Sequence, residues 1–313
     1  MSIDLYIVLG SAVVGLLVGL TGMGGGALMT PMLVLLFGVT PSAAIASDLM
    51  AALFMKPAGV AIHWRRKTVN NDIVKYLCVG SVPAAFAGTY VMHLLGQSVL
   101  AEHRLQILLG SALIIGALAI FYRSVFVEAP PSGLELATAR PLPTIAIGIV
   151  GGFMVGLTSV GAGSLILVLL VMVYPTLSNS QLVGTDLTQS LPLTLSATLG
   201  TLLFSHVDFS LTTSIIIGSV PAVIVGSLLS SRSNGYLLRR VITGVVLLSG
   251  LKYVGVPTDG LGIIAVGVML LIVFISVRHW RRGQRLLLAE PDLVPEPVEG
   301  VVALLPTWLD GDL

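Results

Sequence analysis

The stretch Gly19-Leu20-Thr21-Gly22-Met23-Gly24-Gly25-Gly26 stands between two apolar segments, and it returns 137 residues later as Gly156-Leu157-Thr158-Ser159-Val160-Gly161-Ala162-Gly163. Between 15–28 and 152–165, 8 of 14 positions are identical. Glycine is unfavourable inside a helix, so each glycine-rich stretch predicts a break between two helices. The repeat predicts two related halves, each organised around one glycine turn.

Two further motifs follow the glycine turns in both halves. Ser47-Asp48-Leu49 aligns with Thr185-Asp186-Leu187 at an offset of 138 residues, and Gly80-Ser81-Val82-Pro83-Ala84 aligns with Gly218-Ser219-Val220-Pro221-Ala222 at the same offset. Chance similarity between apolar segments could explain one such match. Three matches in the same order indicate that the halves are homologous.

The composition predicts an all-α polytopic membrane protein. The chain is 55% hydrophobic and 10% charged, with a mean hydropathy of +1.01. A soluble domain of this length could not cover its surface with so few charges. Apolar runs approaching the length of a bilayer-spanning helix recur, and the period-two alternation of a β-barrel is absent. The lipid bilayer is therefore the first expected partner.

Charge and cysteine content exclude other classes. The net charge of +1, without a basic stripe, predicts no nucleic-acid partner. Cys78 is the only cysteine, so neither a disulfide framework nor a cysteine metal site is expected. We expect no cofactor and no metal, and the sequence leaves open whether the chain forms a homo-oligomer.

Hydropathy divides the chain into regions. The expected apolar segments are 5–20, 27–38, 42–62, 76–95, 104–122, 141–158, 164–174, 180–204, 211–230, 238–255 and 260–277. They predict a first transmembrane repeat at 1–122, a cytoplasmic linker at 123–140, a second transmembrane repeat at 141–258, an extra C-terminal transmembrane helix at 259–280 and a cytoplasmic tail at 281–313.

The distribution of Lys and Arg predicts the orientation of these segments. Basic residues gather in the loops 63–75, 123–140, 231–240 and 278–285. If the short segments 27–38 and 164–174 count as crossings, all four loops lie in the cytoplasm, as the positive-inside rule requires. Each half then has five crossings. Because five is odd, the sequence predicts two inverted-topology repeats with helices broken at the glycine turns, an arrangement typical of transporters.

The glycine turns are the candidate binding site. Non-helical backbone at membrane depth must be buried in protein or line a watery cavity. Free N–H groups at the start of a half-helix favour an anion, and glycine permits close approach. The alternatives are close helix packing through small residues and a dinucleotide fingerprint, which lacks its strand here. The candidate substrate-binding residues are Thr21, Gly22, Gly24, Gly25, Gly26, Thr158, Ser159, Gly161, Gly163 and Ser164.

Asp48 and Asp186 occupy equivalent positions in apolar segments, where a carboxylate is costly. Each follows Ser or Thr as in a helix N-cap, so one interpretation is a cap or a brace for the glycine turn. The other is a proton-coupling group. Lys56 lies near the basic loop, and we expect its side chain to snorkel to the interface, with attraction of an anion as the alternative. The polar residues of 185–196 either line a cavity or bond neighbouring helices.

The doubled Gly-Leu-Thr-x-x-Gly-x-Gly, the Ser/Thr-Asp-Leu and the paired Gly-Ser-Val-Pro-Ala resemble the sulfite exporter TauE/SafE family of membrane permeases across residues 5–277. The resemblance implies a multi-pass carrier in the plasma membrane of a bacterium or archaeon. Its implied substrates are small sulfur-containing or organic anions such as sulfite and sulfonates. The halves differ from strict symmetry at Gly22 and Ser159 and at Gly25 and Ala162.

These observations favour a secondary transporter for small anions that works by alternating access, with proton coupling left open. No nucleotide-binding motif is present. The alternatives are an anion channel and an intramembrane protease that uses Asp48 and Asp186. The protease interpretation fits less well, because Gly184-Thr185-Asp186 is one residue short of the Gly-x-Gly-Asp spacing of such enzymes.

Overall fold

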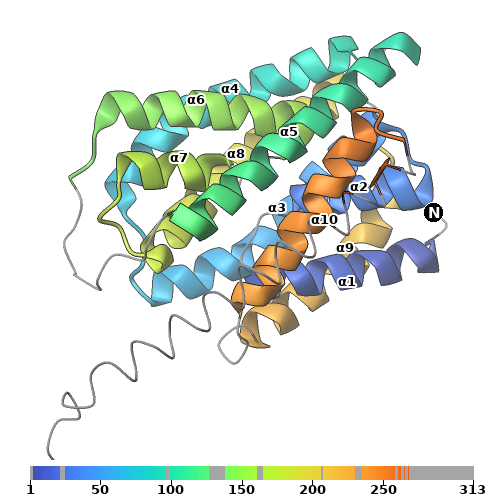
Figure 1. The fold of residues 1–313 in the computed structure, drawn as a ribbon. Helices are drawn as coiled ribbons and strands as arrows, with labels where there is room; N and C mark the ends of the chain where they lie inside the picture. Colours follow the sequence, from blue (N-terminus) through green and yellow to red (C-terminus); the bar gives the residue numbers. More distant parts are fainter. Residues whose placement is uncertain are drawn as a thin grey trace, which may run out of the picture. The chain divides into compact units, whose positions relative to one another are not determined.

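The computed structural model describes residues 3–21, 25–95, 99–126, 138–160, 165–205, 207–229, 235–257, 260, 261, 264 and 267. Every regular element within this part of the chain is an α-helix (Figure 1). The helices are α1 Leu5–Thr21, α2 Gly26–Phe37, α3 Pro41–Arg65, α4 Asn71–Leu95, α5 Val99–Phe126, α6 Pro141–Thr158, α7 Leu165–Val173, α8 Asn179–Phe204, α9 Phe209–Leu229 and α10 Gly235–Tyr253.

These helices confirm the expected all-α fold. Helix α5 runs to Phe126, so it continues four residues past the end expected at 122. Most of the linker 123–140, most of the extra helix expected at 259–280 and the whole tail 281–313 lie outside the described residues. Among the described helices, α3, α4, α6 and α9 are long and apolar enough to cross a bilayer, and α1 and α2 are shorter apolar helices.

The glycine turns reverse the chain into helical hairpins. Helix α2 has 12 residues and α7 has 9, which at about 1.5 Å per residue is too short to cross a bilayer of about 30 Å. Gly10, in the first half of α1, lies against Met32 and Phe37 of α2. Gly151 of α6 likewise lies against Ile166 of α7. Each short helix therefore folds back along the longer helix before it.

Two helix pairs join the halves through close, parallel contacts. Helix α1 packs along α9, and α4 packs along α6 (Figure 1). Gly15 lies against the Ser219 backbone, and Leu20 lies against Gly226 further along both helices, so α1 and α9 run in the same direction. In the other pair, Gly80 contacts the backbone at Ile149, and Gly88 contacts it at Leu157. Small residues permit this close packing of membrane helices. Close helix packing, which the sequence offered as an alternative for the glycine turns, is the role of these glycines inside the helices.

The equivalent helices α3 and α8 pack on each other in opposite directions. The Thr198 hydroxyl, near the end of α8, donates to the carbonyl of Leu49 in the first half of α3 at 3.1 Å. Gly59, further along α3, lies against Leu187, which comes earlier in α8. Later residues of α3 therefore contact earlier residues of α8, so the two helices are antiparallel.

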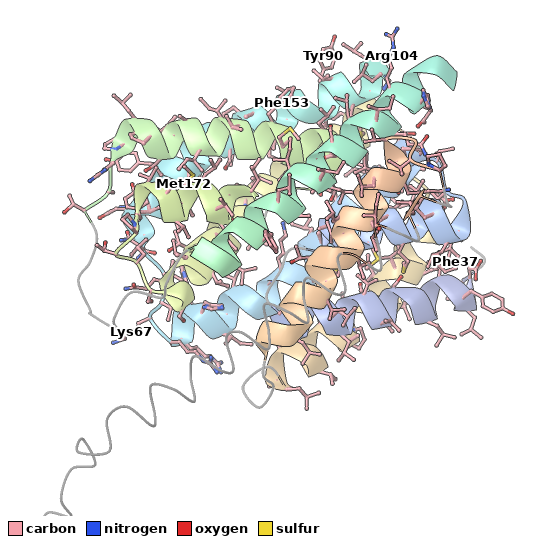
Figure 2. The ribbon with its side chains drawn as sticks, in the orientation of Figure 1. Phe37, Lys67, Tyr90, Arg104, Phe153 and Met172 are labelled. Atoms are coloured by element: carbon pink, nitrogen blue, oxygen red, sulfur yellow. The ribbon has the colours of Figure 1, made fainter. Side chains whose placement is uncertain are left out.

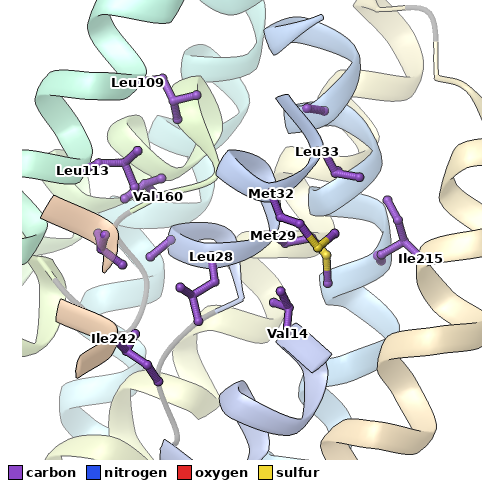
Figure 3. Packing of buried hydrophobic residues seen from close by; sticks show 14 of the residues in the cluster. Val14, Leu28, Met29, Met32, Leu33, Leu109, Leu113, Val160, Ile215 and Ile242 are labelled. Carbon is purple, nitrogen blue, oxygen red and sulfur yellow. The ribbon is translucent and has the colours of Figure 1, made fainter. Parts of the chain in front are cut away.

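Two apolar cores each combine helices from both halves. One joins α1, α2 and α3 with α5, α9 and α10, and the other joins α3, α4 and α5 with α6, α7 and α8. Figure 3 shows the first core, where Met29, Met32 and Leu33 of α2 lie between Val14 of α1 and Ile215 of α9. The halves are therefore interlocked rather than separate.

Apolar and polar side chains are distributed over this fold as in a membrane protein. Exposed side chains on the outer helix faces are largely apolar, among them Tyr90 and Met172 (Figure 2). Buried positions, in contrast, include Asp48, Asp186 and Gln189. An apolar exterior suits a hydrocarbon solvent, and polar groups placed inside such a protein mark functional sites.

Candidate functional site

The two glycine turns meet in the structure. Gly25 is the N-cap residue of α2, and no side chain caps that end of the helix. Gly26, the first residue of α2, lies so close to the Ser159 backbone that a Cβ would overlap its carbonyl oxygen. Ser159 is the C-cap residue of α6. Two segments more than 130 residues apart in the sequence thus form one feature.

Ser159 has an unusual backbone for its residue type. Its φ is +58°, in the left-handed region that favours glycine, and its N–H donates to the Val155 carbonyl at 2.7 Å. The equivalent residue of the first half is Gly22, which lies outside the described residues. Serine here supplies a hydroxyl that glycine could not, and that hydroxyl reaches Asp48.

Asp48 is fully buried and braces the second glycine turn. Its Oδ2 accepts hydrogen bonds from Thr30 Oγ1 and from Ser159 Oγ, both at 2.8 Å. Its Oδ1 has no hydrogen-bond partner among the described residues and lies about 4.0 Å from where a Cβ of Gly25 would stand. The carboxyl group therefore bonds Ser159 of the second turn and lies near Gly25 of the first.

The N-cap interpretation of the two aspartates is wrong. Helix α3 begins at Pro41 after the N-cap residue Thr40, so Asp48 lies two turns inside the helix. Helix α8 begins at Asn179 after Ser178, whose hydroxyl forms a capping box with Gln181. Both helices have their caps further upstream because Ser178 and Pro41 supply better start signals. The brace interpretation agrees with the contacts of Asp48.

Asp186 has a different environment from its equivalent. Its Oδ1 accepts a hydrogen bond from Gln189 Nε2 at 3.2 Å. The Oε1 atom of Gln189 in turn accepts from Ser81 Oγ at 3.0 Å. An amide from the same helix is thus one partner of Asp186, and Ser81 of α4 bonds the other end of that amide.

Lys56 follows Asp48 on α3, and its side chain reaches α8. Its Nζ donates to the Ser190 carbonyl at 3.4 Å and to the Thr194 hydroxyl, both on α8. The ammonium also interacts electrostatically with Asp186 and with Asp48. The expected snorkelling to the interface is therefore wrong, because hydrogen-bond acceptors on α8 hold the ammonium inside the bundle.

A family comparison agrees with this architecture. The family model described as sulfite exporter TauE/SafE matches residues 7–253. The chain belongs to this family. In this TauE/SafE chain, the matched segment runs from α1 to the last residue of α10 and contains both glycine turns, Lys56 and both aspartates.

Curated relatives carry transporter names. The chain is 39% identical over 256 residues to the probable membrane transporter protein YjnA of Bacillus subtilis (strain 168), an alignment that covers 79% of this chain and 98% of the relative. It is 23% identical to YdhB of the same organism over 249 residues, with 79% and 98% covered. It is 28% identical to a probable membrane transporter protein of Xylella fastidiosa (strain 9a5c) over 259 residues, with 80% and 95% covered.

No solved structure matches this TauE/SafE chain significantly. The family and the relatives identify a multi-pass membrane transporter, and their names are those of transporters rather than enzymes. Within the part of the chain that the structure describes, no group of three His, Cys, Asp or Glu side chains could hold a metal ion.

The other predicted substrate-binding residues of this TauE/SafE chain divide into two groups. The hydroxyls of Thr21 and Thr158 donate to carbonyls of their own helices, at Leu17 and Met154, both at 2.7 Å. The remaining positions lie outside the described residues: Gly22, Gly24, Gly161, Gly163 and Ser164.

The polar stretch of α8 bonds both its own helix and neighbouring segments. The hydroxyls of Thr188, Ser190 and Thr194 donate to carbonyls within α8. The Thr185 hydroxyl accepts from the Asn70 N–H at 3.1 Å, and the Ser196 hydroxyl donates to the Val82 carbonyl at 2.7 Å. The bonds to other segments agree with the helix–helix interpretation for Thr185 and Ser196.

Sequence reasoning had missed the position of Lys56 in this TauE/SafE chain, although one signal could have found it. At the offset of 138 residues that relates Asp48 to Asp186, the equivalent of Lys56 is Thr194. Thr194 is also its hydrogen-bond partner. The hydrogen bond between α3 and α8 thus joins two residues that the repeat makes equivalent.

Proposed function

We propose that the chain is a secondary carrier that moves small anions of the sulfite or sulfonate kind across the plasma membrane of a bacterial or archaeal cell. The observation that carries the proposal is the meeting of the two glycine turns at Asp48, on the same helix as a lysine whose ammonium is held by acceptors of α8. Of the lysine and arginine side chains whose exposure the structure describes, Lys56 alone is not exposed. Placing a cation inside a membrane protein costs free energy, so such residues are rare and mark functional sites.

The substrate would bind where the turns and Lys56 come together. The start of α2 has no side-chain cap, so its first N–H groups and the positive end of the helix dipole favour an anion. The residues proposed to contact it remain those of the two turns, with Lys56 added as the attracting charge. The choice of sulfite or sulfonate rests on the family.

We further propose that the halves have inverted topology and exchange access by rocking. The antiparallel packing of α3 and α8 supports this, because equivalent helices run in opposite directions only if the axis relating them lies across the helices. The moving bodies would each include helices of both halves. In this topology each hairpin of a long and a short helix returns the chain to the side from which it entered, so the N-terminus lies outside and the C-terminus lies in the cytoplasm.

Flux measurements in proteoliposomes test the proposal. The full chain would be reconstituted and offered sulfite, sulfate, thiosulfate, ethanesulfonate and acetate, one at a time, with and without an imposed pH gradient. We expect saturable uptake of one anion class and accelerated exchange when the same anion is loaded inside. Flux that does not saturate and shows no exchange would indicate a channel instead. Absence of flux for every anion, from folded and inserted protein, would refute the anion proposal.

A further inference from the structure

The two equivalent aspartates have different chemical surroundings, and the difference suggests a division of roles. Asp48 accepts hydrogen bonds from two hydroxyls, and the partners of Asp186 include the amide of Gln189. Both side chains are buried, at 0% and 2% exposure. Symmetry alone would give both residues the same role, so the contacts decide which one can change its charge.

The surroundings of Asp48 accept either form of the carboxyl group. A hydroxyl carries one proton and two lone pairs, so Thr30 and Ser159 can donate to a carboxylate or accept from a carboxylic acid. The Oδ1 atom, which has no hydrogen-bond partner, lies next to Gly25 at the start of α2. A proton on Oδ1 would be directed towards the place where the anion is proposed to bind.

The surroundings of Asp186 favour the ionised form. The Nε2 group of Gln189 is a donor only, and the hydroxyl of Ser81 holds the other end of that amide. Lys56 also interacts electrostatically with this carboxylate. A carboxylate that accepts from an amide and faces an ammonium is stabilised in its charged state.

The charge count gives the consequence. Lys56 and Asp186 together are neutral, so an ionised Asp48 leaves the cluster with a net negative charge that repels an anion. A proton on Asp48 removes that charge and adds a hydrogen-bond donor. We therefore propose that Asp48 binds the proton that accompanies the transported anion, while Asp186 stays ionised as the fixed partner of Lys56. This inference rests on the proposed anion-carrier function.

Other titratable groups around Asp48 do not replace it in this role. Helices α2 and α9 contain no titratable side chain. Helix α5 reaches α3 through Glu102, which bonds Ser42 at the start of α3, well before Asp48. From α8 the only charged side chain is Asp186. The proton would come from water on the side where the anion enters and return to water where the anion leaves.

Proton uptake on anion binding tests the assignment directly. The purified full chain, in weak buffer with a pH-indicating dye, would be mixed with sulfite and with ethanesulfonate. The wild type should take up about one proton for each anion bound, as linkage between the two requires. Asp48→Asn should take up none, and Asp186→Asn should still take up protons. Any proton that the anion itself exchanges cancels in the difference between wild type and variant.

Milder variants keep the test decisive if Asp48→Asn does not fold. Ser159→Ala and Thr30→Val each remove one hydroxyl that donates to the Asp48 carboxylate and should raise the pH at half-maximal flux by about one to two units, since each such bond stabilises the charged form. Ser111→Ala is the matched control, because its hydroxyl bonds only its own helix, at the Leu108 carbonyl.

The outcomes separate this inference from the proposed function. Proton uptake by Asp48→Asn equal to that of the wild type would overturn the assignment, and so would a loss confined to Asp186→Asn. Anion transport by the wild type without any proton uptake would overturn the inference while leaving the carrier function intact. Absence of both transport and anion binding in the wild type would overturn the two together.

Discussion

Replacing Gly26 by alanine tests the meeting of the two glycine turns. The added Cβ would overlap the Ser159 carbonyl oxygen and lie 2.7 Å from the carbonyl carbon and 2.9 Å from Oγ. The Ser159 backbone cannot rotate away from the added Cβ as the end of a side chain could. The two glycine turns must therefore move apart to accommodate it. Overpacking of this kind costs about 1–3 kcal/mol. At about 1.4 kcal/mol per tenfold change, the native contact would weaken roughly 5- to 150-fold.

The matched control for Gly26→Ala is Gly59→Ala in α3. Its Cβ would lie 3.5 Å from Leu187 Cδ1, an ordinary contact, and alanine is the better helix former. Thermal unfolding in detergent and anion exchange in proteoliposomes would be measured for both variants. We expect a lower melting temperature and little exchange for Gly26→Ala, with both near wild type for Gly59→Ala. Equal behaviour of the two variants would refute the reasoning that the turns touch.

Three further predictions concern charge and packing. Lys56→Met should abolish saturable anion flux, whereas Lys252→Met, which alters an exposed lysine at the end of α10, should not; equal flux in both would contradict the role of the buried ammonium. Gly152→Ala should lower the melting temperature, because its Cβ would lie 2.6 Å from the Ser81 Cα in the α4–α6 contact; an unchanged value would contradict that packing. Thr198→Val removes one bond between α3 and α8 and should cost about 0.6 kcal/mol of stability with flux retained, so a loss of flux at normal stability would show that the hydroxyl does more than pack.

The helices could be predicted well because their signals are local. Hydropathy gave α6 its observed bounds of 141–158 and placed α1, α2 and α7 within a residue or two. Glycine-rich stretches and start signals such as Pro41 act within a few residues of themselves. The end of α5 was less predictable, because its last turn, up to Phe126, carries polar residues that hydropathy assigns to a loop.

The candidate site could be predicted only in part. The glycine turns and the two aspartates were identified because the repeat displays them twice. The capping role given to Asp48 was wrong, since a Ser-Asp pair has the same local appearance at a helix start and inside a helix. The prediction for the Lys56 ammonium was also wrong. A lysine near a basic loop usually places its ammonium in interfacial water, but here α8 supplies hydrogen-bond acceptors inside the bundle.

By itself, the sequence determined the membrane-helix class, the two related halves, the breaks at the glycine turns and the equivalence of Asp48 with Asp186. Each of these follows from composition, periodicity or internal repetition, and these can be read directly from the order of residues in the chain. Only the tertiary structure decided that Ser159 of one half holds Asp48 of the other, and that acceptors of α8 hold the ammonium of Lys56. Those contacts join residues that chain order keeps far apart, and they depend on how the halves interlock. A nearly symmetric sequence therefore becomes an asymmetric site, because each aspartate takes the partners that the opposite half or a neighbouring helix presents to it.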